Sequence, residues 1–131
     1  MSFRKKIIVL LLFLIGLSSL SAYYLTFLSL NSHIQNDIKK HENIVLLFSA
    51  SWCSACKTLK PELDSALDES TGFKFYRIGS SLNKLERKIL FEKYNVTGIP
   101  TLILFKKGKE TNRLLGVHTK DELLQAFSSL I

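Results

Sequence analysis

The sequence contains only two cysteines and two prolines among its 131 residues. Cys53 and Cys56 stand three positions apart, and a bridge between them would close a very short loop. Such a loop removes little entropy from the unfolded chain, so a purely structural disulfide would contribute little stability. No nucleotide-binding or flavin-binding motif occurs, so any electrons for redox chemistry must come from a partner. Internal repeats and low-complexity segments are also absent.

Charge is distributed unevenly along the chain. There are 18 basic and 11 acidic residues, a formal net charge of +7, yet no acidic residue precedes Asp37. Arg4, Lys5 and Lys6 stand directly before an apolar stretch, and most other basic residues are scattered. The densest later group, at 106–109, suits a solvated hairpin turn, with a position near anionic lipid as the alternative. Basic and aromatic residues do not cluster as on a nucleic-acid surface, so we expect no nucleic-acid partner.

Residues 7–30 contain no charged side chain. At about 1.5 Å per residue, a helix of this length would cross a hydrocarbon core of roughly 30 Å. We therefore predict a transmembrane or signal-anchor helix over residues 1–30. The alternative is a cleaved signal peptide, with small residues at 18–22 near the cleavage site. Because the basic flank stays in the cytoplasm, both interpretations place the rest of the chain in the periplasm or otherwise outside the cytoplasm, either anchored or secreted.

Beyond the anchor, hydrophobic periodicity predicts one α/β domain over residues 43–131, preceded by a linker or short helix at 31–42. The order β-α-β-α-β-β-α predicts a four-stranded mixed sheet flanked by helices on both faces. A right-handed crossover makes the first two strands parallel. Strands are expected at 44–50, 73–78, 101–105 and 111–117, and helices at 53–68, 82–94 and 120–130.

Three local features accompany these helices. Pro61 should kink the first of them, because proline cannot donate the helical hydrogen bond. Thr119 and Glu122 have the spacing of a capping box at the start of the last helix. The helix at 82–94 is expected to point four apolar side chains inward: Leu82, Leu85, Ile89 and Leu90.

The cysteine pair lies where the apolar strand at 44–50 gives way to a helix. Unpaired backbone N–H groups at a helix N-terminus favour the thiolate, which is the reactive form of cysteine. Two thiols at this spacing can close a small disulfide and reopen it. The junction therefore indicates a redox-active pair.

Residues 43–131 resemble the thioredoxin-fold family. The resemblance is carried by Trp-Cys-x-x-Cys-Lys at 52–57, Pro61, Gly98-Ile99-Pro100-Thr101, and Gly116 after the fourth strand. Ser54-Ala55 is most similar to the corresponding pair in the C-terminal domain of transmembrane thiol-disulfide interchange proteins. That domain passes reducing equivalents to periplasmic partners.

The resemblance implies a role for each matching residue. Cys53 would be the exposed nucleophile that attacks a substrate disulfide, and Cys56, one turn deeper, would release the reduced substrate. Pro100 would be the cis-proline beside the disulfide, and Ile99 would offer its backbone to a substrate strand. Trp52 would shield the pair, with a place in the core as the alternative.

The sequence departs from the family pattern near the second cysteine. The family usually has a buried aspartate six residues before the first cysteine, where this chain has Leu47. Some relatives also have an acidic residue four positions after the second cysteine, where this chain has Lys60. Proton exchange at Cys56 would therefore pass through water or substrate. Since Ser54-Ala55 offers no His, only the helix terminus and Lys57 remain to lower the pKa of Cys53. We therefore expect a reducing to intermediate potential.

The sequence thus predicts a membrane-anchored, extracytoplasmic thiol-disulfide oxidoreductase that reduces or exchanges disulfides of exported proteins. Its partners would be protein disulfides and a membrane electron donor, and it would need no cofactor besides the Cys53–Cys56 disulfide. One alternative is metal delivery, in which His33, His41 or His118 joins the cysteines as ligands. The other is a binding module of the same fold that has no catalytic role.

Overall fold

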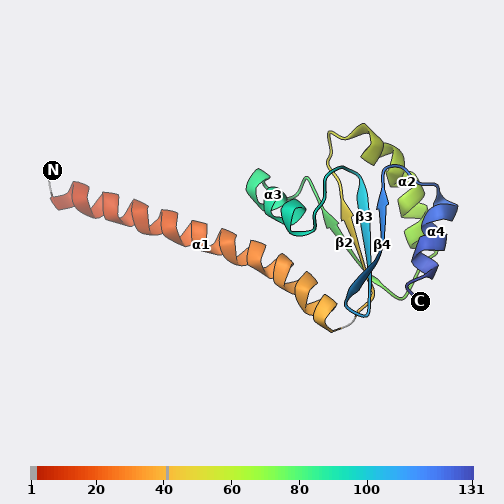
Figure 1. The fold of residues 1–131 in the computed structure, drawn as a ribbon. Coiled ribbons are helices and arrows are strands. Elements are labelled where there is room, and N and C mark those ends of the chain that lie inside the picture. The colour runs from red at the N-terminus through yellow and green to blue at the C-terminus, as the bar shows by residue number, and fades with distance from the viewer. Residues whose placement is uncertain (1–2, 41) are drawn as a thin grey trace. The chain divides into compact units, whose positions relative to one another are not determined.

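The computed structural model describes residues 3–40 and 42–131. Their element order is α1-β1-α2-β2-α3-β3-β4-α4 (Figure 1). The chain divides into two compact units, Met1–Ile34 and Gln35–Ile131. His41, one of the candidate metal ligands, lies outside the described residues.

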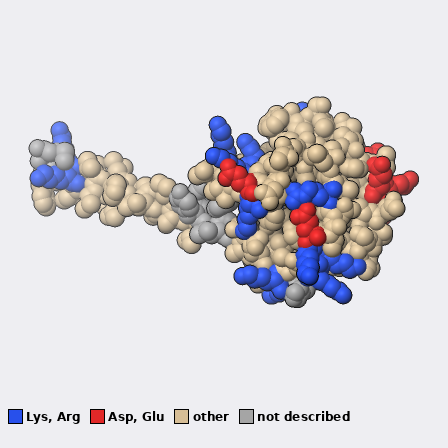
Figure 2. Space-filling view, viewed as in Figure 1, with Lys and Arg blue, Asp and Glu red and all other residues tan. Residues whose placement is uncertain are grey.

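The helix α1 runs from Phe3 to Lys39. Residues 31–42 were expected to form a linker or a short helix. The structure has a helix there, as a continuation of α1 up to Lys39. Within α1, the 20-residue segment Phe3–Ala22 is long and apolar enough to span a membrane, with a mean hydropathy of 1.9 and no buried residue. Figure 2 shows basic side chains at the N-terminal end of this helix, followed by a stretch without charge.

The sheet has the order β2-β1-β3-β4. The strands β1 (Ile44–Phe48) and β2 (Lys74–Ile78) are parallel, as predicted. The strands β3 (Thr101–Lys106) and β4 (Lys109–Leu115) form an antiparallel hairpin, and β3 also runs antiparallel to β1. This confirms the four-stranded mixed sheet and leaves β1, the strand that leads to the cysteines, in its interior.

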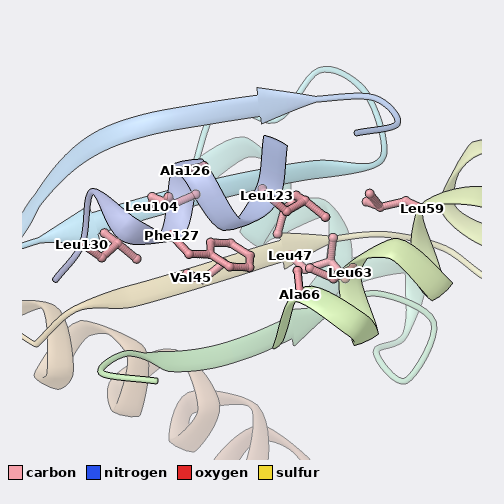
Figure 3. Packing of buried hydrophobic residues seen from close by; sticks show 11 residues of the cluster. Val45, Leu47, Leu59, Leu63, Ala66, Leu104, Leu123, Ala126, Phe127 and Leu130 are labelled. Atoms are coloured by element: carbon pink, nitrogen blue, oxygen red, sulfur yellow. The ribbon is translucent and has the colours of Figure 1, made fainter. Parts of the chain in front are cut away.

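Helices cover both faces of the sheet. The helices α2 (Ser54–Asp68) and α4 (Lys120–Ser128) pack together on one face (Figure 1). Their apolar side chains meet those of β1 and β3 in one cluster (Figure 3). Burial of these side chains stabilises the domain and fixes α2 against the end of β1. The cluster consists of Val45, Leu47, Leu59, Leu63, Ala66, Leu102, Leu104, Leu123, Ala126, Phe127 and Leu130.

The helix α3 (Lys84–Lys93) packs on the opposite face of the sheet. There Phe48 of β1 packs against Phe91, with ring centroids 5.2 Å apart, and against Tyr94 at 5.7 Å. The expectation that Leu85 and Ile89 point inward is wrong, because they are 57% and 41% exposed.

The physical reason is the packing of Phe91 on Phe48, which turns the side of α3 that carries Leu90 and Phe91 toward the sheet. Asn83 and Glu86 form a capping box that starts the helix at Lys84, and Glu86 and Leu90 are its buried residues. The inward stripe of α3 is therefore rotated from the one that the apolar spacing suggested. The capping box of Thr119 and Glu122 in α4 forms as predicted.

Candidate active site

The two cysteines lie at the N-terminus of α2, directly after β1. Cys53 is the N-cap residue, and its sulfur accepts a hydrogen bond from the backbone N–H of Cys56 at 3.1 Å. The Cys53 N–H donates to the Ala50 carbonyl at 3.2 Å, which fixes the turn between strand and helix. Cys53 and Cys56 form a disulfide with their Cα atoms 5.2 Å apart. The structure therefore holds this pair in its oxidised form.

A second segment, distant in sequence, reaches the disulfide. The Ile99–Pro100 peptide bond is cis, as the family resemblance implied. The Ile99 carbonyl oxygen lies 3.8 Å from the Cys53 sulfur. Thr101 donates its hydroxyl to the Gly98 carbonyl at 2.6 Å, and the Gly116 N–H donates to the Pro100 carbonyl at 2.9 Å. Gly116 has a positive φ of 91°, a conformation that favours glycine, so its place after β4 helps to fix this loop.

The burial of the two cysteines differs from the expectation. Cys53 is only 7% exposed, whereas Cys56 is half-buried. In the oxidised structure the expected order, with Cys53 exposed and Cys56 deeper, is therefore wrong. The reason is that Cys53 lies between the Ile99 carbonyl and the first turn of α2, while Cys56 borders a cavity.

Trp52 is 73% exposed, so its alternative interpretation as a core residue is wrong. Together with Phe91, Val96 and Ile99 it lines a groove of about 320 Å³ on one side of the disulfide. Ile99 is common to this groove and to the contact with Cys53. The groove thus places an aromatic ring and the Ile99 backbone near the Cys53 sulfur.

The other side of the disulfide holds a cavity of about 290 Å³ that Cys56, Lys57 and Pro100 border. Its remaining walls come from the ends of β1 and β2, from α2, and from the turn after β2. Gly79 is required in that turn, because a Cβ there would collide with the Ser49 carbonyl. The lining residues are Leu47, Ser49, Ala50, Ser51, Cys56, Lys57, Leu59, Lys60, Leu63, Arg77, Gly79, Ser80, Ser81 and Pro100.

Sequence reasoning identified Leu47, Lys57 and Lys60 near the pair but missed Arg77 and Ser80. Ser80 accepts a hydrogen bond from the Ser51 N–H at 2.6 Å, which ties the turn after β2 to the loop before the cysteines. No signal in the sequence marked these residues, because only the pairing of β1 with β2 brings them to the site.

Pro61, the remaining residue in the predicted site, lies inside α2 and is exposed. Proline has no N–H to donate, so the Lys57 carbonyl lacks its usual helical partner. Among residues 3–40 and 42–131, no group of three or more His, Cys, Asp or Glu side chains could hold a metal ion. His118 instead lies 3.2 Å from Glu122 and 3.2 Å from the Leu115 carbonyl.

A mixed sheet flanked by helices, a Cys-x-x-Cys disulfide at a helix N-terminus and a cis-proline beside it define a thiol-disulfide oxidoreductase of the thioredoxin fold. The thioredoxin family model matches residues 26–129. The chain therefore belongs to the thioredoxin family.

Similar proteins agree with this assignment. Thioredoxin of Chlamydia caviae is 38% identical over 82 residues, which cover 63% of this chain and 76% of that protein. The thiol:disulfide interchange protein DsbD of Campylobacter jejuni is 34% identical over 107 residues, 79% of this chain but 18% of that protein. The crystal structure of thioredoxin NaTrxh from Nicotiana alata superposes with a TM-score of 0.66 at 27% identity, and covers 78% of this chain and 84% of that one.

Proposed function

We propose that the protein is a membrane-anchored thiol-disulfide oxidoreductase that acts outside the cytoplasm and reduces or exchanges disulfides of exported proteins. The observation that carries this proposal is the Cys53–Cys56 disulfide at the N-terminus of α2, in a chain that begins with an apolar helix of membrane-spanning length. The similarity to part of the DsbD protein supports a supply of electrons from a membrane partner.

Cys53 is the nucleophile in the proposed reaction. In the disulfide form its sulfur accepts the Cys56 N–H at the N-terminus of α2, and in the reduced protein the same groups would stabilise the negative charge of the thiolate. The thiolate attacks one sulfur of the substrate disulfide and forms a mixed disulfide, while the other substrate sulfur leaves as a thiolate. Cys56 then loses its proton and attacks the Cys53 sulfur. The second substrate sulfur leaves, so the substrate is now reduced and Cys53 and Cys56 form a disulfide.

The direction of this exchange is reduction of the substrate. The dipeptide Ser54-Ala55 supplies no imidazolium that would stabilise the Cys53 thiolate further, and Lys57 is the nearest cation in the sequence. A less stabilised thiolate corresponds to a more reducing pair. A donor protein must therefore return two electrons to the disulfide after each turnover, and the disulfide is the only cofactor that this chemistry requires.

Trp52, Ile99 and Pro100 bind the substrate in this proposal. An extended substrate segment lying in the groove would place its disulfide beside Cys53 and pair with the backbone of Ile99. The exposed indole of Trp52 offers a large apolar surface at the rim of the groove.

A trapping experiment on the full chain tests the proposal. A Cys56→Ala variant cannot release the mixed disulfide, so it should accumulate exported proteins, and its electron donor, linked through Cys53. The matched control is Cys53→Ala with Cys56→Ala, which should trap nothing. Capture of cytoplasmic proteins alone would refute the location, and an empty trap would refute the activity. Insulin reduction by the wild-type protein, but not by Cys53→Ala, gives an independent measure of turnover.

A further inference from the structure

The groove beside Trp52 continues onto the outer face of α3. A hollow of about 700 Å³ lies on that face, and part of its wall is also the wall of the groove. We call the groove and the hollow together the extended groove. It begins beside the Ile99 carbonyl, next to the Cys53 sulfur, and ends on α3. The shared residues are Arg87, Phe91, Val96 and Thr97, and the hollow adds Lys84, Lys88, Glu92 and Asn95.

The helical period brings the side chains of α3 together in this surface. Lys84, Arg87, Lys88 and Phe91 are three or four positions apart, so they are neighbours along one face of α3. Phe91 and Arg87 are half-buried, whereas Lys84 and Lys88 are exposed. The extended groove is therefore apolar near Trp52 and basic farther from the disulfide, and Arg87 lies where the two parts meet.

The basic part carries an excess of positive charge. Its ionisable lining residues are three cations, Lys84, Arg87 and Lys88, and one carboxylate, Glu92. Glu92 lies 3.7 Å from Lys88 and offsets its charge. Among residues 3–40 and 42–131, Lys84 and Arg87 form no ion pair. Figure 2 shows basic side chains gathered where Figure 1 draws α3.

The position of this charge indicates what it binds. The extended groove starts at the sulfur that attacks the substrate, so a chain that lies in it belongs to the molecule whose disulfide is exchanged. An extended chain advances about 3.3 Å per residue, and α3 rises about 1.5 Å per residue. A segment lying along α3 would therefore pass from Phe91 to Arg87 in about two residues and to Lys84 in about three.

We propose that the extended groove selects protein disulfides that have an acidic side chain a few residues from the cysteine, and that this side chain pairs with Arg87 and Lys84. The inference rests on the proposed function and names its class of substrate: exported proteins with an acidic segment beside the disulfide. Apolar residues next to the substrate cysteine would lie against Trp52 and Phe91. Complementary charges at the rim of an interface mainly raise the rate of association.

The test uses the reduced full-length protein in detergent micelles and synthetic peptides that carry one cysteine as a mixed disulfide with 2-thiopyridone. The Cys53 thiolate attacks the peptide sulfur and displaces 2-thiopyridone, whose absorbance gives the rate constant. In one series a single aspartate moves away from the cysteine, position by position, on either side. Matched series carry asparagine or lysine at the same positions.

At the favoured positions, we expect aspartate peptides to react about three- to fivefold faster than asparagine peptides at low salt, as for one ion pair at a surface. Lysine peptides should be slower than both, and added salt should reduce the differences. Equal rate constants for the three series would overturn this inference and leave the proposed function intact. If no peptide reacts faster with the wild-type protein than with Cys53→Ala, the proposed function is refuted, and this inference with it.

Charge variants assign the preference to the extended groove. Arg87→Gln should remove most of it, Arg87→Lys should keep it, and Arg87→Glu should reverse it in favour of lysine peptides. Lys109→Gln, at the start of β4, is the matched control and should keep both the preference and the rate. A preference for aspartate that persists in Arg87→Glu would overturn the proposal, because another cation would then be responsible. The peptide comparison needs no variant, so it decides the proposal even if a substitution disturbs folding.

Discussion

Replacement of Leu47 by aspartate should restore a proton acceptor behind Cys56, at a cost in stability. Leu47 is 2% exposed, belongs to the main hydrophobic cluster and lines the cavity that Cys56 borders. Loss of a buried leucine side chain costs about 1.5–3 kcal/mol. Burial of a polar group without a hydrogen-bond partner adds about 1–3 kcal/mol. The free energy of unfolding should therefore fall by about 2.5–6 kcal/mol.

The same burial makes the new carboxyl a useful base. Desolvation raises the pKa of a buried aspartate toward neutral pH, where a general base is most effective. A positioned base contributes about 10²–10⁴-fold to a proton-transfer step. Only part of this factor is expected, since the new carboxyl would replace the water or substrate that we expect to take the proton, so the release of substrate by Cys56 at pH 7 should accelerate by at least about tenfold.

The matched control is Leu47→Asn, which has nearly the same size and polarity but cannot accept the proton. Urea denaturation should give similar losses of stability for both variants. Stopped-flow measurement of the decay of a preformed mixed disulfide at Cys53 should show acceleration for Leu47→Asp alone. Equal decay rates in the two variants would refute the argument that Cys56 lacks a protein base.

Three further predictions concern the groove, a helix cap and the acid sensitivity of the fold. Trp52→Ala should change the free energy of unfolding by less than about 0.5 kcal/mol, since the indole is 73% exposed, but lower kcat/KM for insulin. Thr119→Ala should destabilise the domain by about 1 kcal/mol in urea, since its hydroxyl caps α4. The Tyr76 hydroxyl, 2.6 Å away, and Lys74 lower the pKa of Asp37 below its ordinary value of 3.8. The stability from Asp37 is therefore present above this value and lost as the pH falls through the lowered pKa, so urea midpoints should drop as the pH is lowered below 3.8, and less steeply in Tyr76→Phe.

The main features of the fold could be predicted because they depend on local patterns. The continuous apolar runs at 44–48 and 101–105 are buried strands, and the crossover rule correctly made β1 and β2 parallel. The spacing of Thr119 and Glu122 was sufficient to predict where α4 begins. The inward face of α3 could not be obtained in this way, because the packing of Phe91 on Phe48 sets it and a polar residue, Glu86, is buried on that side.

The active site was predictable only in part, for a similar reason. The cysteine pair and the cis-proline follow from contiguous motifs, and the structure brings them together as expected. The burial of each sulfur depends instead on segments that come from elsewhere in the chain. Ile99 approaches Cys53 across 46 positions, and Arg77 reaches the cavity only through the pairing of β2 with β1. Exposure of a residue in a motif is a tertiary property, which the motif alone does not contain.

The low exposure of Cys53 is compatible with its role as nucleophile. A sulfur that lies against the Ile99 carbonyl in the disulfide form is already beside the backbone that would hold a substrate strand. The hydrogen bond from the Cys56 N–H acts on the Cys53 sulfur, the atom that carries the negative charge in the proposed nucleophile. Attack on a substrate disulfide requires a thiolate, and the helix N-terminus favours the charged form of Cys53. The Ile99 contact and the hydrogen bond at the N-terminus of α2 thus act on the same sulfur: the first places it beside the substrate-binding backbone, and the second stabilises its charge.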